Sequence, residues 1–431
     1  MSKVSPSVER PDPAEIDPRT YLFERYDDMR GRSAALRGYY TIKPMLPRRI
    51  QLALRRAYAH RQALRRFPAW PIEPLLVEHQ HEQLRRRLNT AREGMVPLLN
   101  FWPNGHGFAV VLTHDVETGT GIEKIGALLD LERRHNLVSS WNFVAEDYPI
   151  PDGTFERIRA AGGEIGLHGI HHDGKLFSDR RTFEAELAKI HRYLAAWDAV
   201  GFRSPATLRN PDWMPDLGCL YDSSFPDTDP FEPRPGGCCS IFPYFLSDLV
   251  ELPITLPQDH TLWEILRKRS IDLWREKGDW LIAHHGLLNV IVHPDYVDSS
   301  ERLELYDELL GYLRARLDAE HGWHALPRDV ASWWRARADL RIEGSTRFTR
   351  IAGESRVPTH LGRPTVAWAY ELDGALAIDC RDRSGGAGGA FAAEAGQAPE
   401  IGVPSDRGLP ARPLPDSSAR LPVTGGETTP P

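Results

Sequence analysis

Two histidines spaced four residues apart lie in the stretch GLHGIHHD, where His168 and His172 directly follow a short apolar run. With this spacing, both imidazoles can bind one divalent ion from a single helical turn or a tight loop. Upstream, the apolar run VVL leads into THDVE, which carries the carboxylates of Asp115 and Glu117 two positions apart. Two strand-like runs that each end in residues of metal-ligand type predict a site that binds a metal ion.

Such a set of residues could activate water for hydrolysis. A hydrolytic metal site uses about three protein ligands and leaves one position open, where water loses a proton near neutral pH. His168, His172 and one of the two acids would be the ligands, and the other acid would be the base; the residue types leave the choice open. Arg203 would keep the base ionised, and His293, in the run VIVHPD, would protonate a leaving amine.

Each of these residues also has a structural alternative. The paired histidines could be ordinary loop residues, and either acid could cap a helix that begins near Gly-Thr-Gly at 119–121. Arg203 could form a surface ion pair, and His293 could be a core histidine whose role falls to His284 or His285. His171 lies between the paired histidines and would point elsewhere on a helical turn, so we assign it no ligand role.

Between residues 105 and 334, strand-like runs alternate with helix-like runs, the pattern expected of parallel βα units. The strand-like segments are 108–113, 139–144, 164–168, 200–203, 249–256 and 287–293, and the helix-like segments are 122–135, 155–161, 180–197, 262–274 and 301–317. In barrel-like α/β folds the chemistry lies beyond the carboxyl ends of the strands. All the candidate residues fall there, which favours an α/β barrel with one shared site.

Five motifs follow one another in an order that resembles a known family: Thr113–Glu117, His168-x-x-x-His172, Phe202–Pro205, Tyr221–Ser224 and Val292–Pro294. Together they resemble the NodB-homology polysaccharide deacetylases, the family-four carbohydrate esterases, over residues 105 to 300. The resemblance implies a distorted (β/α) barrel of the glycoside hydrolase/deacetylase type. It also implies a hydrolase that removes N- or O-acyl groups from sugars with a divalent ion, usually zinc.

The resemblance assigns catalytic roles to three residues. Asp115 matches the base that deprotonates the attacking water, Arg203 matches the arginine that orients this base, and His293 matches the general acid. The implied reaction is hydrolysis of an amide by metal-activated water. The oxyanion would be stabilised by the metal and a backbone N–H, and the products would be a carboxylic acid, most often acetate, and a free amine.

The resemblance also implies the metal ligands. His168 and His172 match the two metal histidines, and Glu117 takes the place of the acidic ligand, as in members with an Asp-x-acid arrangement. The sequence departs from the usual adjacent Asp-Asp pair, because Val116 cannot ligate a metal. It also departs at Ala206, where an aromatic residue is common, so substrate contacts there would differ. We expect Zn²⁺, with Co²⁺ as a substitute.

Composition limits the class of partner. The 431 residues carry a formal net charge of −7 with a pI near 6.2, which gives no support to nucleic-acid binding. Four cysteines without paired CxxC spacing indicate a reducing compartment. The charged, Pro-rich start has no apolar block of an export signal, so we expect a cytoplasmic protein. The expected substrate is then an acylated sugar or a lipid- or nucleotide-linked glycan intermediate.

Two further functions stay open: a deformylase or other small-amide hydrolase on the same scaffold, and a catalytically inactive, carbohydrate-binding relative.

The predicted regions of the chain are a disordered N-terminus (1–20), a helical extension (21–104), the barrel (105–345) and a Gly/Pro-rich, largely disordered tail (346–431). Within the extension, 47–67 has seven arginines and no acid. This segment is either a solvated helix or a basic amphipathic helix that contacts anionic lipid at the inner membrane face or binds phosphate. The sequence sets no expectation for the oligomeric state.

Overall fold

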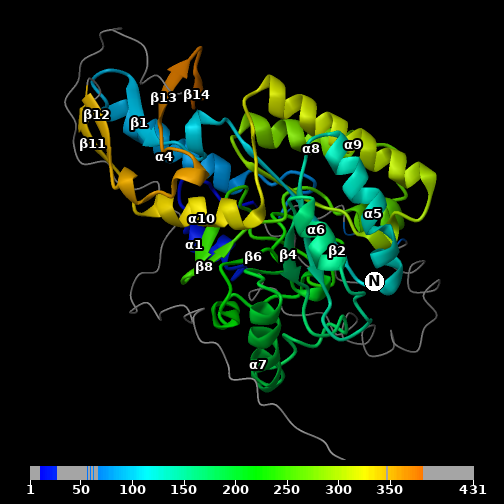
Figure 1. The fold of residues 1–431 in the computed structure, drawn as a ribbon. Helices are drawn as coiled ribbons and strands as arrows, with labels where there is room; N and C mark the ends of the chain where they lie inside the picture. Colours follow the sequence, from blue (N-terminus) through cyan, green and yellow to red (C-terminus); the bar gives the residue numbers. More distant parts are fainter. Residues whose placement is uncertain are drawn as a thin grey trace, which may run out of the picture.

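A curled sheet of parallel strands forms the centre of the computed structural model, which describes residues 10–26, 67–345 and 348–381 and the single residues Arg56, Ala59 and Gln62 (Figure 1). Seven strands run parallel in the spatial order β9-β2-β3-β4-β5-β6-β8. In chain order they are β2 (Ala109–Val116), β3 (Ser139–Phe143), β4 (Glu164–Leu167), β5 (Gly201–Phe202), β6 (Tyr221–Asp222), β8 (Leu249–Glu251) and β9 (Leu287–Ile291). β7 (Tyr244–Leu246) pairs antiparallel with β8, and β10 (Trp323–His324) pairs parallel with the first residues of β2. The predicted α/β barrel-like fold is confirmed.

The chain after β8 brings the curled sheet back to β9. The Leu256 N–H donates to the carbonyl of Asn289 (3.2 Å), and the Asn289 side-chain amide donates to the carbonyls of Leu252 (3.2 Å) and Pro253 (3.0 Å). The Thr255 hydroxyl donates to the carbonyl of Leu287 (2.5 Å). These few bonds replace a regular strand ladder at this seam. The strand predicted at 249–256 therefore forms regular strand pairing only over its first three residues, 249–251.

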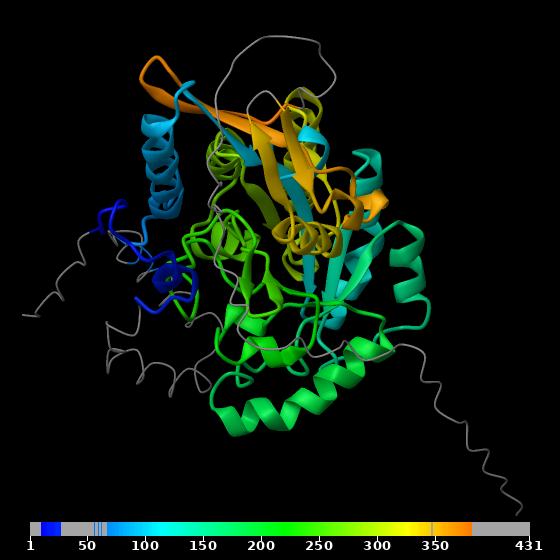
Figure 2. The same cartoon turned by 90° about the vertical axis from the view of Figure 1, so that its left-hand side faces the viewer.

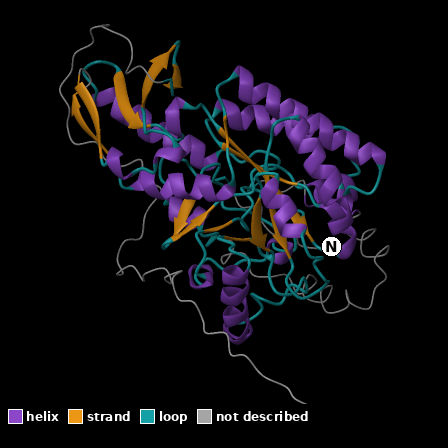
Figure 3. Ribbon diagram, viewed as in Figure 1, coloured by secondary structure: helices purple, strands orange, loops and turns teal. Residues whose placement is uncertain are grey.

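Helices cover the outside of the central strands (Figure 3). They are α5 (Gly119–Arg134), α6 (Thr154–Ala160), α7 (Arg180–Ala196), α8 (Asp272–Ala283), α9 (Ser300–Ala319) and α10 (Pro327–Ala338). The side chains of Thr118, Asp179 and Ser299 cap α5, α7 and α9 by accepting backbone N–H groups that have no partner within the helix. The strands are buried on both faces; every residue of β2 is buried, as expected for a parallel sheet covered by helices.

The helix predicted at 262–274 is wrong as one element. The structure has a π-helical turn, η6 (His260–Ile265), and a separate helix α8 that begins at Asp272. Between them Arg267 adopts a left-handed conformation (φ 54°), which a continuous helix does not allow. The other short helical turns are η3 (Pro103–Gly105), η4 (Pro205–Thr207), η5 (Met214–Leu217), η7 (Pro294–Tyr296), η8 (Glu354–Arg356) and η9 (Thr359–Leu361).

Segments before and after the barrel pair with each other. β1 (Met95–Leu99) lies antiparallel to β13 (Val366–Leu372), which pairs with β14 (Ala375–Asp379); β11 (Arg341–Ser345) and β12 (Phe348–Ala352) form a second hairpin. Figure 2 shows the β13–β14 hairpin above the helix α4 (Leu75–Thr90). The predicted disorder is therefore wrong for residues 348–381, because alternate residues of β13 bury their side chains against the barrel. Residues 382–431 lie outside the described residues.

The predicted disordered N-terminus also needs correction. The helix α1 (Pro18–Leu22) is capped by Asp17 and buries Tyr21 and Leu22. Most of the basic segment 47–67 lies outside the described residues. Within it, the Arg56 guanidinium donates to the carbonyl of Glu264 (2.8 Å). In the described part of the chain, no helix combines the length and apolar character needed to cross a membrane.

Candidate metal centre

The carboxyl ends of four parallel strands bring the predicted site residues together at one end of the barrel. Asp115 is the last residue but one of β2. His168 and Arg203 directly follow β4 and β5, and His293 is the second residue after β9. Glu117 is the first residue after β2. Because these strands are parallel, their carboxyl ends meet at the same edge of the sheet.

The spacing of the two acids follows from the alternation of side chains along β2. Residues two apart on a strand point to the same side, so Asp115 and Glu117 both face the site. His114 points to the outer side, where its Nε2 lies 2.6 Å from Oε1 of Glu132 on α5. Val116 is fully buried. The residue between the acids is therefore part of the packing against the helices, and an Asp-x-Glu pattern places both carboxylates at the site.

Glu117, His168 and His172 form a group whose ligand atoms all lie within 4.8 Å of one another, the only such cluster of His, Cys, Asp or Glu in the described part of the chain. Nε2 of His172 lies 3.1 Å from Oε1 of Glu117. Nε2 of His168 is buried without a hydrogen-bond partner, and Nε2 of His172, also buried, faces the Glu117 carboxylate. Two imidazole nitrogens and one carboxylate fit the donor set of a catalytic zinc site.

A second contact fixes the orientation of His168. Its Nδ1 lies 3.0 Å from the carbonyl oxygen of Arg203, which accepts from Nδ1–H and leaves the lone pair of Nε2 facing the cluster. Burial lowers the pKa of His168 to about 4, although the nearby Asp115 opposes this shift. The ring is therefore neutral near pH 7, the form that binds a metal.

The cluster histidines keep Glu117 ionised. Burial alone would raise the pKa of Glu117, but the nearby His172, His293 and His168 lower it well below its ordinary value. For His172, burial acts to lower the pKa, and the Glu117 carboxylate raises it to a net value above normal. Each group thus favours the opposite charge on its neighbour, as expected where a cation site contains a carboxylate.

Asp115 lies beside the cluster and is held as a carboxylate. The side-chain amide of Asn142 on β3 donates to its Oδ1 (2.8 Å), and Arg203 lies 3.5 Å from its Oδ2. Burial acts to raise its pKa, yet Arg203, His168, His293 and the Asn142 hydrogen bond lower the pKa to about 2. Gly166, the register partner of Asn142 on β4, leaves room for the amide, because a Cβ there would lie 2.0 Å from Oδ1 of Asn142.

Arg203 is almost fully buried, with 1% of its surface exposed. Its guanidinium donates to the hydroxyls of Thr113 (3.2 Å) and Ser223 (3.0 Å). The Ser223 hydroxyl in turn accepts from the side-chain amide of Asn289 (2.9 Å). These bonds fix the guanidinium next to Asp115. The alternative that Arg203 forms an ion pair on the surface is therefore wrong.

His293 faces both acids and is held from behind by a third. Its Nε2 lies 3.9 Å from Oδ2 of Asp115 and 3.8 Å from Oε1 of Glu117. Its Nδ1 and its backbone N–H contact the two oxygens of Asp259, at 2.6 and 2.7 Å. Burial acts to lower the pKa of His293, but the charge and hydrogen bond of Asp259, with the two other acids, raise it to about 10.

The sequence analysis missed Asp259 and Asn142. Asp259 is fully buried just before η6, and the sequence signal was an acid shortly after the strand-like run 249–256. Asn142 was visible as a polar residue inside the strand-like run 139–144. Neither has a motif spacing, because both act through contacts between neighbouring strands.

The other histidines considered lie elsewhere. His171 turns its Nδ1 to the carboxylate of Asp147 (2.7 Å). Nδ1 of His284 lies 2.7 Å from the carbonyl oxygen of Trp280, and Nδ1 of His285 lies 3.0 Å from the carbonyl oxygen of Gly107, just before β2 begins. These contacts place His284 and His285 at the opposite end of the barrel from His293.

The loop after Arg203 has an uncommon backbone. Ala206 and Thr207 both have positive φ values, 53° and 50°, in the 3₁₀ turn η4. Non-glycine residues are found there at a cost, mainly in turns and functional sites. The departure at Ala206 noted from the sequence thus coincides with a strained turn beside the candidate centre.

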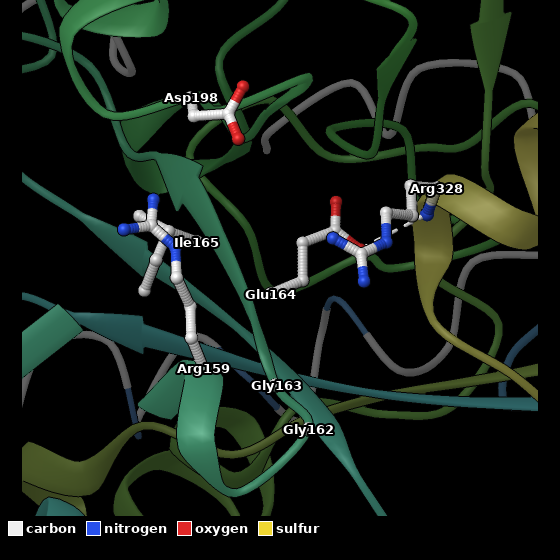
Figure 4. Close-up of a pocket in the computed structure, with 7 residues that line it drawn as sticks. All are labelled: Arg159, Gly162, Gly163, Glu164, Ile165, Asp198 and Arg328. Carbon is white, nitrogen blue, oxygen red and sulfur yellow. Dashed lines mark hydrogen bonds between the residues drawn. The ribbon is translucent and has the colours of Figure 1, made fainter. Parts of the chain in front are cut away.

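A pocket of about 280 Å³ lies away from this centre, around the first residues of β4 (Figure 4). It is lined by Arg159, Gly162, Gly163, Glu164, Ile165, Asp198 and Arg328. Glu164 is buried, and its carboxylate accepts from the Tyr221 hydroxyl (2.9 Å) and the backbone N–H of Arg328 (3.2 Å). This pocket is at the amino ends of the strands and does not contact the candidate metal ligands.

Comparison with known proteins gives structural likenesses only. No family model matches the chain, and no curated protein matches it. Its structure is similar to that of a Mycobacterium smegmatis protein assigned as a polysaccharide deacetylase (21% identity, 57% of this chain and 96% of that chain, TM-score 0.42). It is also similar to PuuE allantoinase (14% identity, 56% and 94%, TM-score 0.43) and to a CE4 family pseudoenzyme from Bacillus anthracis (15% identity, 52% and 65%, TM-score 0.33).

Proposed function

We propose that this protein is a metal-dependent hydrolase that removes an acyl group, most simply N-acetyl, from an amino sugar. The observation that carries the proposal is that the buried Nε2 of His168, which has no hydrogen-bond partner, and the buried Nε2 of His172 both face Glu117. Buried polar atoms without partners are uncommon in native structures and point to a missing ion or water. Asp115 and His293 lie next to this group, where they would serve as base and acid beside the bound ion.

Glu117, His168 and His172 would hold the divalent ion, with zinc as our first choice and cobalt as a substitute. When bound, such an ion supplies positive charge that polarises an acyl carbonyl and lowers the pKa of water. Asp115 accepts the proton from the attacking water, and Arg203 and Asn142 keep its carboxylate ionised and oriented.

His293 then donates a proton to the leaving amine. Its Nε2 faces the two acids of the site, while Asp259 holds Nδ1 and stabilises the protonated ring. The order of the five sequence motifs supports the assignment of these roles, and we propose on that basis a divergent member of the NodB-homology deacetylases.

The substrate class and its location also belong to the proposal. All four cysteines are free and buried, which supports a reducing compartment. We therefore favour an acylated sugar, or a lipid- or nucleotide-linked glycan intermediate, inside the cell. The proposal also includes contact of the 47–67 segment with the inner membrane face. One arginine of this segment, Arg56, donates to the carbonyl of Glu264.

The test is a product screen with the full chain, loaded with Zn²⁺ or Co²⁺, on N-acetylated sugars, sugar nucleotides and small amides. We expect equal amounts of free amine and acetate from an acetylated sugar, loss of activity in H168A, and normal activity in H171A, the neighbouring histidine that faces Asp147. Formate or a ring-opened acid from the small amides would favour the deformylase or small-amide alternative. Sugar binding without turnover in the metal-loaded chain would favour the inactive, carbohydrate-binding alternative.

A further inference from the structure

Glu117 is the ligand in the position that departs from the family pattern, and the turn after β9 contacts it at two points. From these contacts we infer that Asp295 and Tyr296 are positioning residues that set the reach of the Glu117 carboxylate toward the metal site. The inference rests on the proposed function, because it concerns how one ligand of that site is held. Both residues lie in η7 (Pro294–Tyr296), directly after His293.

The first contact holds the backbone of the ligand. Glu117 lies just past the end of the β2 ladder, and its N–H donates to Oδ2 of Asp295 (2.9 Å). The hydroxyl of Thr118 donates to Oδ1 of the same carboxylate. Thr118 is also the N-cap of α5 and accepts the N–H of Thr120 (3.2 Å). One carboxylate therefore fixes the point where β2 ends and α5 begins.

A glycine keeps the space that this contact needs. A Cβ at Gly121 would lie 2.4 Å from Oδ2 of Asp295 and 2.9 Å from its Cγ. Gly121 does not have a positive φ, so the requirement for glycine is space rather than conformation. Any larger residue at 121 would push the Asp295 carboxylate away from the N–H of Glu117.

The second contact orients the carboxylate itself. The Tyr296 hydroxyl donates to Oε2 of Glu117 (3.3 Å), while Oε1 lies 3.1 Å from Nε2 of His172. The Tyr296 ring packs edge-on against His293, with ring centroids 5.2 Å apart. The hydroxyl thus occupies one oxygen and leaves the other facing the histidines.

Together the two contacts explain how an acid two positions beyond Asp115 can act as a ligand. A longer Glu side chain on a loop has more rotamers than Asp on a strand, so it binds well only if its backbone and one oxygen are fixed. Outer partners of metal ligands typically change metal affinity by about 10- to 100-fold when removed. Asp295 and Tyr296 would have that effect without touching the ion.

The experiment measures the Zn²⁺ affinity of the full chain by competition with a chromophoric chelator, and the absorption spectrum of bound Co²⁺ as a second readout. We expect about 10- to 100-fold weaker Zn²⁺ binding in D295N and a smaller loss, roughly 3- to 10-fold, in Y296F, with an altered Co²⁺ spectrum. G121A tests the same contact from the other side and should also weaken binding. The matched control is D298N, on the same loop, whose side chain is 63% exposed and pairs with Arg302.

The outcomes separate this inference from the proposed function. Normal Zn²⁺ affinity in D295N, Y296F and G121A, with tight binding by the wild type, overturns the inference and leaves the metal site standing. Absence of Zn²⁺ binding by the folded wild type overturns the proposed function and this inference with it. If D295N fails to fold, as judged by circular dichroism, Y296F still decides, because it removes only one hydroxyl.

Discussion

Replacing Glu164 by Gln should make the stability of the protein less dependent on pH. Glu164 begins β4, with 3% of its surface exposed, and its oxygens accept from the Tyr221 hydroxyl and the Arg328 N–H (Figure 4). Burial raises its pKa from 4.5 to about 7, and the two hydrogen bonds and the Arg328 charge only partly oppose this. The carboxyl is therefore stable in the fold mainly in its neutral form.

The sign of the effect follows from proton binding. Since the pKa is higher in the folded state, the folded chain binds more protons than the unfolded chain between pH 4.5 and about 7, and stability falls as pH rises through this range. The difference between the two pKa values corresponds to a loss of about 3 kcal/mol of stability, which is complete above pH 7. In E164Q the amide is neutral at every pH and can accept from Arg328 and donate to Tyr221, so this loss should vanish.

The assay is urea unfolding followed by tryptophan fluorescence from pH 4.5 to pH 8. The free energy of unfolding of E164Q minus that of the wild type should rise from near zero at pH 4.5 to about 3 kcal/mol at pH 8. E123Q, at an exposed position on α5, is the matched control and should show no such trend. A difference between E164Q and the wild type that stays constant with pH would refute the assigned cause.

Three further variants have defined outcomes. D115N should lower kcat by about 10²- to 10⁴-fold on the substrate found by the screen while Zn²⁺ content is unchanged, because it removes a base and not a ligand; loss of Zn²⁺ instead would give Asp115 the ligand role. E117Q should keep the fold but weaken Zn²⁺ binding at least about 10-fold in the chelator competition, and unchanged affinity would remove Glu117 from the ligand set. K277M should lower the free energy of unfolding by about 3–5 kcal/mol in urea, because Lys277 is buried 2.7 Å from Asp227, which would be left unpaired; a loss under about 1 kcal/mol would contradict this.

The sequence predicted the convergence of the site residues because each one directly follows an apolar run. A buried parallel strand needs such a run, and the carboxyl ends of parallel strands lie at the same end of the barrel. The residue order alone therefore places Asp115, His168, Arg203 and His293 at that end. Glu117 was identified from the Asp-x-acid arrangement of the family that the sequence resembles, and alternation along β2 explains why it lies on the same side as Asp115.

Other features depend on contacts that have no local signal. Asp259 reaches His293 across the seam between the segment after β8 and β9, and Asn142 reaches Asp115 from the next strand only because Gly166 leaves room. The β13–β14 hairpin was hidden in a segment that reads as Gly- and Pro-rich, because its pairing partner β1 lies far upstream in the chain; the paired residues Leu99 and Val366 are 267 positions apart.

The central claim is that Glu117, His168 and His172 bind one divalent ion. The most direct measurement is the metal content of the purified full chain after loading with Zn²⁺ and dialysis, for the wild type, H168A and H171A. The structure predicts about one ion per chain in the wild type and in H171A, and little in folded H168A. Equal metal content in H168A and the wild type, or no bound metal in the folded wild type, would contradict the claim.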